Sequence, residues 1–138
     1  MAPGLFAYGT LQIPEILQHL LGRTLPATHA VLAGYRCFRL GDKPYPAIIE
    51  QPHARVSGLL HAGVSDAELR LLDRYEGELY ERRLVDLQTA AGVLPGFVYV
   101  LGAAHREQIG SDEWDLATFR RDHLPQYLQE VARTRRAP

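Results

Sequence analysis

The sequence predicts an α+β domain in which a small mixed β-barrel, or a strongly curved sheet, carries helices on its outside. Two observations favour this fold class. Residues 27–61 alternate short apolar runs with turn formers, as is typical of β structure. Only one or two helical patterns interrupt the strand-like middle of the chain. A doubly wound parallel sheet would instead alternate strand and helix regularly.

The composition indicates one globular unit. The chain has 138 residues, too few for two ordinary domains, so we expect a single domain over residues 1–138. Apolar residues make up 46% and charged residues 22%, which allows a sizeable core. The 15 Lys and Arg residues against 16 Asp and Glu residues give a net charge of -1. Neither nucleic acid nor an anionic membrane is therefore an expected partner.

Cysteine usage and hydropathy bear on the compartment. The single cysteine, Cys37, excludes an internal disulfide and a thiolate zinc site. The N-terminus shows no secretory pattern, and no apolar stretch approaches the roughly 18 to 20 residues that cross a bilayer. We therefore expect a soluble, cytoplasmic protein.

Two elements are predicted near the N-terminus. Residues 4–9 predict a short buried strand that ends in a glycine turn. Apolar residues then recur at helical spacing from Pro14 to Leu21. Pro14 suits the first helical position and Gly22 suits the C-terminal cap, so a short helix is expected.

The middle of the chain predicts four strands, at residues 30–32, 35–40, 47–49 and 55–61. Turn formers at Gly34, at residues 41–44 and at residues 51–52 separate them. Each strand is expected to end at these residues.

The remaining elements are a helix, a hairpin and a helical tail. Ser65 begins an S-x-x-E capping box, and the helix that follows is expected to end before Gly77. Residues 80–90 and 93–101 predict two strands joined by a hairpin turn. Residues 112–136 predict two short helices with a break near the proline at position 125.

The turn from Tyr8 to Gln12 is the first candidate for chemistry. A strand that ends in glycine just before a helix can direct several backbone N–H groups into one concavity, which suits a carboxylate or a phosphate. The turn lacks the glycines and the lysine of a phosphate-binding loop or a dinucleotide fingerprint. A plain connection between strand and helix is the competing interpretation.

Glu76 is the second candidate. It lies at the negative end of the predicted helix, with Asp73 one turn before it and Glu78 two residues after it. All three features favour a raised pKa for Glu76, as a general base near neutral pH requires. Nearby arginines are able to cancel this effect. The competing interpretation is therefore a solvated acidic helix end.

Other catalytic arrangements find little support. The six histidines form no H-x-H or H-E-x-x-H pair, so no metal site is expected. No G-x-S-x-G elbow is present. Cys37 lies in a predicted strand beside Phe38, which favours a buried small hydrophobe over a nucleophile.

Five segments together show a resemblance to a known family. They are residues 5–11 (LFAYGTL), 45–49 (YPAII), 72–77 (LDRYEG), 80–82 (YER) and 98–100 (VYV). In this order and spacing the chain resembles the γ-glutamylcyclotransferase-like superfamily, and within it the avirulence-induced-gene-like branch. The similarity covers about residues 5 to 101.

The resemblance implies a small mixed β-barrel flanked by helices. It also implies an enzyme without a cofactor, which converts a γ-glutamyl-amine or γ-glutamyl-peptide to 5-oxoproline and a free amine. Glu76 matches the family's acid/base glutamate. In the family, the backbone of a loop cradles the γ-glutamyl group, and the matching loop residues here are Tyr8, Gly9, Thr10 and Leu11. A tyrosine that lines the family's site matches Tyr80.

This chemistry fits the residues, because the substrate's own α-amino group is the nucleophile and the protein need supply only a base and anion-binding groups. Further candidates for the pocket wall are Tyr35, Arg36, Arg39, Tyr45 and Arg82. The leaving group and the oligomeric state are not evident from the sequence.

Two hypotheses of other classes stay open. The first is a non-catalytic module that binds a small carboxylated metabolite in the same pocket. The second is an interaction protein whose C-terminal helix docks a partner, which requires Trp114, Phe119 and Tyr127 to be exposed.

Overall fold

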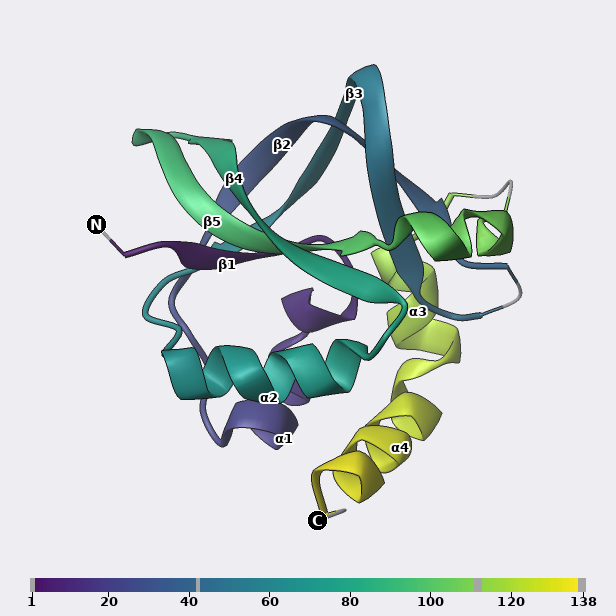
Figure 1. Cartoon of the computed structure of the whole chain (residues 1–138). Coiled ribbons are helices and arrows are strands. Elements are labelled where there is room, and N and C mark those ends of the chain that lie inside the picture. Colours follow the sequence, from purple (N-terminus) through teal and green to yellow (C-terminus); the bar gives the residue numbers. More distant parts are fainter. Residues whose placement is uncertain (1, 42, 111–112, 137–138) are drawn as a thin grey trace.

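The five strands close into a small mixed barrel (Figure 1). The computed structural model describes residues 2–41, 43–110 and 113–136. The strands are β1 (Gly4–Ala7), β2 (Ala27–Arg39), β3 (Pro46–His61), β4 (Tyr80–Thr89) and β5 (Gly92–Leu101), in the spatial order β1-β3-β2-β4-β5. The barrel is mixed because β1 pairs parallel with β5, whereas the other pairings are antiparallel. The predicted α+β fold class is confirmed.

The α-helices gather on one side of the barrel, below it in Figure 1. They are α1 (Pro14–Leu21), α2 (Asp66–Glu76), α3 (Leu116–Asp122) and α4 (Leu124–Arg136), and two 3₁₀ turns, η1 (Thr10–Gln12) and η2 (Ala103–Gln108), complete the chain. Gly22 caps α1 in the left-handed conformation with φ 77°, as its sequence predicts. Among the described residues, no helix combines the length and the apolar character needed to span a membrane.

The prediction of four strands in the middle of the chain is wrong, because the structure has two long ones. Gly34 does not end a strand but marks an irregularity, since the pairing jumps from Ala33 with Arg55 to Tyr35 with Glu50. Residues 51–52, expected to form a turn, remain inside β3. A bulge lets a strand bend without ending, and the curvature of a closed barrel requires such bends.

Helix α2 is fixed at its start by the predicted capping box. The Ser65 hydroxyl accepts a hydrogen bond from the Glu68 N–H at 3.1 Å, and the Glu68 carboxylate accepts one from the Ser65 N–H at 3.0 Å. Arg23 also donates to Glu68, with nitrogen–oxygen distances of 2.7 and 2.8 Å. This guanidinium is the main reason that the pKa of Glu68 falls to about 2. The helix is therefore held at its N-terminal end, and its other end places Glu76.

Strand β1 divides the core into two parts. Side chains alternate along the strand and into the residue after it, so Phe6 and Tyr8 join the cluster inside the barrel while Leu5 and Ala7 join the cluster between the barrel and the helices. All four residues of the strand are buried. This explains why the sequence here is continuously apolar rather than alternating.

The C-terminal helices belong to the second of these clusters. Phe119 is only 1% exposed, and Trp114 and Tyr127 pack against the same apolar residues. The Phe119 ring also contacts the rings of both residues, with centroid distances of 5.8 and 5.2 Å. The hypothesis of a partner-docking C-terminal helix therefore loses the exposed surface that it requires.

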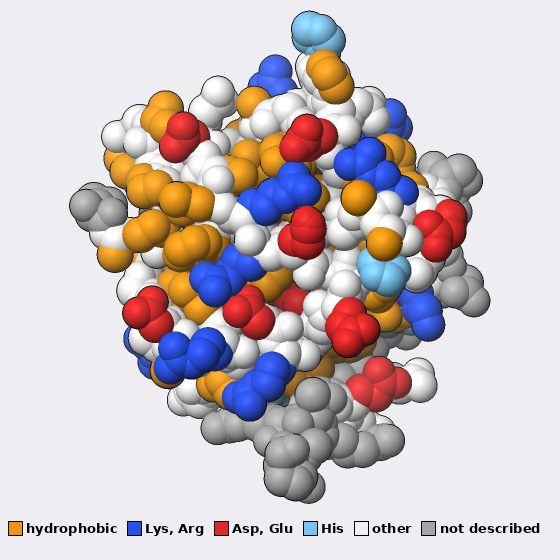
Figure 2. Space-filling view, viewed as in Figure 1, with side chains coloured by type: hydrophobic (Ala, Val, Ile, Leu, Met, Phe, Trp, Pro, Cys, Tyr) orange, Lys and Arg blue, Asp and Glu red, His pale blue; other side chains and the backbone are white. Residues whose placement is uncertain are grey.

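Positive and negative side chains are interspersed on the face shown in Figure 2, in line with the near-zero net charge. Hydrophobic side chains gather at the left of that view, over β4 and β5. Leu84 and Val93 on these strands are 60% and 66% exposed.

Replacement of Gly58 tests how closely β1 and β3 approach each other. A Cβ at this position would lie 2.2 Å from the carbonyl oxygen of Ala7. We expect Gly58→Ala to lower the free energy of unfolding by about 2 kcal/mol or more, because the backbone of one strand has to move. Gly102→Ala is the matched control, since its nearest neighbour would lie at 3.4 Å and its φ of -62° suits alanine. Equal denaturation midpoints for the two variants would contradict the close approach.

Candidate active site

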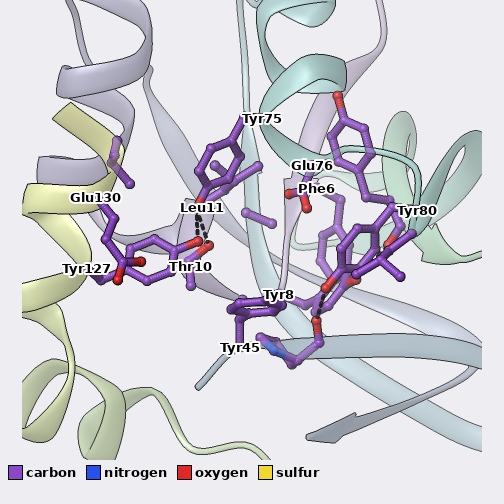
Figure 3. Close-up of a pocket in the computed structure, with 16 residues that line it drawn as sticks. Phe6, Tyr8, Thr10, Leu11, Tyr45, Tyr75, Glu76, Tyr80, Tyr127 and Glu130 are labelled. Atoms are coloured by element: carbon purple, nitrogen blue, oxygen red, sulfur yellow. Dashed lines mark hydrogen bonds between the residues drawn. The ribbon is translucent and has the colours of Figure 1, made fainter. Parts of the chain in front are cut away.

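A pocket of about 300 Å³ lies where the end of β1, the turn after it, the end of α2 and helix α4 meet. Six of the chain's seven tyrosines line it: Tyr8, Tyr45, Tyr75, Tyr80, Tyr99 and Tyr127. Figure 3 shows Glu76 and Tyr80 on one side of the pocket and Tyr127 and Glu130 on the other. Among the described residues, its lining includes these two carboxylates and no lysine, arginine or histidine.

The turn that begins at Tyr8 packs closely against the start of β3. A Cβ on Gly9 would lie 2.7 Å from Cγ of Pro46, so only glycine fits here without a shift. The side-chain amide of Gln12 donates to the carbonyl oxygens of Tyr8 and Gly9, at 2.8 and 3.2 Å, and the Gln12 N–H also donates to Gly9. Because the turn uses its carbonyls internally, its N–H groups are the polar groups it can offer a ligand.

Glu76 is the last residue of α2 and lines this pocket. The loss of water around its carboxyl raises its pKa from an ordinary 4.5 to about 8. No hydrogen bond or ion pair to Glu76 from the rest of the described chain offsets this cost. A carboxyl in this state can give up and take back a proton near neutral pH.

The sequence predicted the direction of this shift but attributed it to the wrong cause. The helix end, Asp73 and Glu78 were expected to raise the pKa, whereas burial does so in the structure. The charge of Asp73 is instead engaged elsewhere: Arg82 forms an ion pair with it at 3.0 Å, and the Tyr99 hydroxyl donates to it at 2.7 Å. These two contacts also fix the last turn of α2 to β4 and β5.

The tyrosine hydroxyls form a neutral, hydrogen-bonded wall. Tyr8 donates to the carbonyl of Tyr99 at 2.6 Å, and Tyr80 donates to the carbonyl of Pro46 at 2.7 Å. Burial raises the pKa of both phenols well above the ordinary 10. They therefore stay protonated wherever Glu76 titrates.

A second group of hydroxyls connects helix α4 to the rest of the pocket. The Tyr75 hydroxyl is hydrogen-bonded both to Thr10 Oγ1, at 3.1 Å, and to the Tyr127 hydroxyl. Burial raises the pKa of Tyr127 to about 12. Three separate stretches of the chain thus meet at one point of the pocket wall.

The structure brings every residue of the predicted site to this one pocket: Tyr8, Gly9, Thr10, Leu11, Glu76 and Tyr80 all line it. Among the further wall candidates Tyr45 does so, whereas Tyr35, Arg36, Arg39 and Arg82 do not. Sequence reasoning missed Tyr75, Tyr99, Tyr127 and Glu130. Tyr75 and Tyr99 lie inside motifs quoted for the resemblance, but Tyr127 and Glu130 carry no local signal.

Cys37 lies apart from this pocket. It packs against the cluster inside the barrel, and burial raises its pKa to about 12. It is thus a thiol that packs rather than reacts. No cluster of three or more potential ligands from His, Cys, Asp and Glu occurs in the described parts of the chain.

Comparisons with known proteins agree with the fold. The family model "Gamma-glutamyl cyclotransferase, AIG2-like" matches residues 5–116. The chain therefore belongs to this family. A relative, AIG2-like protein C of Arabidopsis thaliana, is 40% identical over 83 residues, which are 60% of this chain and 48% of the relative. The chain thus spans about half the length of this relative.

Solved structures show the same fold. The solution structure of a protein from Arabidopsis thaliana matches 99% of this chain and 94% of its own, with a TM-score of 0.71 and 27% identity. A structure named gamma-glutamyl cyclotransferase matches 94% of this chain and 85% of its own, with a TM-score of 0.60. At 17% identity, this second likeness concerns the fold alone.

The raised pKa of Glu76 predicts a pH-dependent effect on stability. Between pH 4.5 and 8 the folded chain keeps a proton that the unfolded chain releases, so this residue makes the fold less stable as the pH rises through that window. Glutamine keeps the shape without the titration. We expect Glu76→Gln to raise the thermal midpoint by about 3 °C or more at pH 8 and to have little effect near pH 4.5.

Thermal unfolding of the wild type and the variant across this pH range measures the effect. Glu78→Gln removes an exposed carboxylate two residues away and outside the pocket, so it serves as the control. A difference between Glu76→Gln and the wild type that stays constant with pH would contradict the raised pKa.

Proposed function

We propose that this protein is a γ-glutamylcyclotransferase that needs no cofactor and releases 5-oxoproline and a free amine from a γ-glutamyl-amine or γ-glutamyl-peptide. The observation that carries the proposal is the placement of Glu76. Its carboxyl, with a pKa of about 8, lines the same tyrosine-walled pocket as the turn from Tyr8 to Leu11. A base and a set of N–H groups are the two parts that this cyclisation requires.

The reaction needs no nucleophile from the protein. The substrate's α-nitrogen attacks its own γ-carbonyl carbon, a new C–N bond closes the five-membered ring, and the bond from that carbon to the leaving nitrogen breaks. Two protons leave the α-nitrogen through Glu76, one before the attack and one from the ring nitrogen after it, and both pass to the leaving nitrogen, which departs as an ammonium, so the carboxyl returns to its starting state. A pKa near 8 suits both transfers, since neither form of the carboxyl is strongly favoured near neutral pH.

The turn provides the anion-binding part. In the proposed complex the N–H groups of Gly9, Thr10 and Leu11 hold the substrate's α-carboxylate or the oxyanion that develops on the γ-carbonyl. Tyr80, held by its hydrogen bond to Pro46, forms the adjacent wall. Holding the substrate folded supplies the rate advantage of an intramolecular reaction.

The comparisons support the same reaction class. The family description names gamma-glutamyl cyclotransferase, and so does a solved structure with the same fold. A pocket that only binds a carboxylated metabolite could have the same turn. It would have no need of a carboxyl whose burial without a partner opposes folding.

The test is the release of 5-oxoproline. We expect the wild type to form it from at least one member of a panel of γ-glutamyl-amines, γ-glutamyl-ε-lysine, γ-glutamyl dipeptides and glutathione. Glu76→Gln should lower kcat by about 10²-fold or more while the protein stays folded, because the amide cannot carry the proton. Glu78→Gln should retain wild-type turnover.

Two results would overturn the proposal. Turnover in Glu76→Gln equal to that of the wild type would remove Glu76 from the mechanism. A folded wild type that forms no product from any member of the panel, yet is stabilised by 5-oxoproline, would show a binding module instead.

A further inference from the structure

A second hollow lies on the barrel where β3 departs from regular pairing. Between the pairs Ala33 with Arg55 and Tyr35 with Glu50, residues 51–54 of β3 lie opposite Gly34 alone. This segment contains His53, whose φ of 66° is the one positive value at a non-glycine residue in the described chain. Such a conformation costs energy, and bulges of this kind frequently re-aim side chains beside functional sites.

The bulge forms one wall of this hollow, which measures about 560 Å³. Gln51 and Arg55 come from β3, Arg36 comes from β2, and Trp114 from the segment before α3 forms another part of the lining. Tyr8 lines both this hollow and the tyrosine pocket, so the two cavities share a wall but present different side chains.

The polar lining of the hollow favours an anion. Two arginines, Arg36 and Arg55, line it, and neither forms an ion pair with any other described residue. The Arg36 guanidinium lies over the Phe38 ring at 4.9 Å, which orients it and leaves its donors available. Glu113 is the one acidic residue among the described residues that line the hollow.

Uncharged side chains that can donate hydrogen bonds also line the hollow. Gln51 and Ser57 line the hollow beside the arginines, and neither is engaged in a side-chain hydrogen bond within the described chain. Guanidinium groups bind carboxylate and phosphate oxygens through paired N–H donors.

We propose that this hollow is a second ligand site, which binds a small molecule carrying a phosphate or two carboxylates through Arg36 and Arg55. The inference does not depend on the proposed cyclotransferase activity, since it uses different side chains in a different cavity. Phosphate and dicarboxylate share the chemistry that the arginines recognise, and the experiment separates them.

Titration of the full chain with inorganic phosphate and, separately, with glutarate tests the site at constant ionic strength. Calorimetry measures the affinity. The chain's one tryptophan, Trp114, lines the hollow, so its fluorescence reports whether the ligand occupies this cavity. We expect saturable binding of at least one of the two probes, and the probe that binds identifies the ligand chemistry.

Variants locate the binding. Arg36→Gln and Arg55→Gln should each weaken the affinity at least tenfold, whereas Glu113→Gln should strengthen it by removing the opposing charge. Arg70→Gln, which changes an exposed arginine on α2 outside the hollow, is the matched control and should bind as the wild type does. Circular dichroism confirms that each variant is folded.

Three results would overturn the proposal. They are the absence of saturable binding for both probes, binding that both arginine variants retain unchanged, and a loss of affinity in Arg70→Gln as large as in Arg36→Gln. Absence of binding would mean that the site does not exist, and unchanged binding in both arginine variants would mean that the ligand binds elsewhere. An equal loss of affinity in Arg70→Gln would mean that the effect depends on the overall charge of the protein.

Discussion

Strand β1 closes the barrel, since it pairs with β3 on one side and with β5 on the other. It is only four residues long and is buried on both faces, so its side chains serve the barrel interior and the helix-side core in alternation. The turn that follows it begins at Tyr8 and is pressed against Pro46 at Gly9. The position of the candidate anion-binding turn is therefore set by closure of the barrel and not by the turn itself.

Glu76, in contrast, is a residue of the candidate site that lowers the stability of the fold. A carboxyl that loses water without gaining a partner favours its neutral form, and the described part of the chain forms no hydrogen bond or ion pair with Glu76. The helix that carries it is held elsewhere instead, by the capping box and Arg23 at its start and by the Asp73 contacts near its end. The contacts that hold α2 in place thus involve Ser65, Glu68 and Asp73 and not Glu76.

Local signals in the sequence were sufficient for some elements and not for others. The ends of α2 follow from Ser65, Glu68 and Gly77, because capping depends only on residues a few positions apart. Gly34 resembled the end of a strand, since whether a glycine ends a strand or bends it depends on the pairing partner, which lies far away in the chain. Glu76 was found through its neighbours and the family resemblance. The cause of its pKa shift came from tertiary burial, and Tyr127 reaches the pocket only through the packing of α4.

The site and the family similarity have different boundaries. The family model ends at residue 116, yet helix α4 begins at Leu124 and supplies Tyr127, Glu130 and Val131 to the pocket. The carboxyl and the glycine turn lie within the residues that the family model matches, and α4 adds side chains from outside them. Substitutions in α4 would therefore change the shape of the cavity without altering Glu76 or the glycine turn.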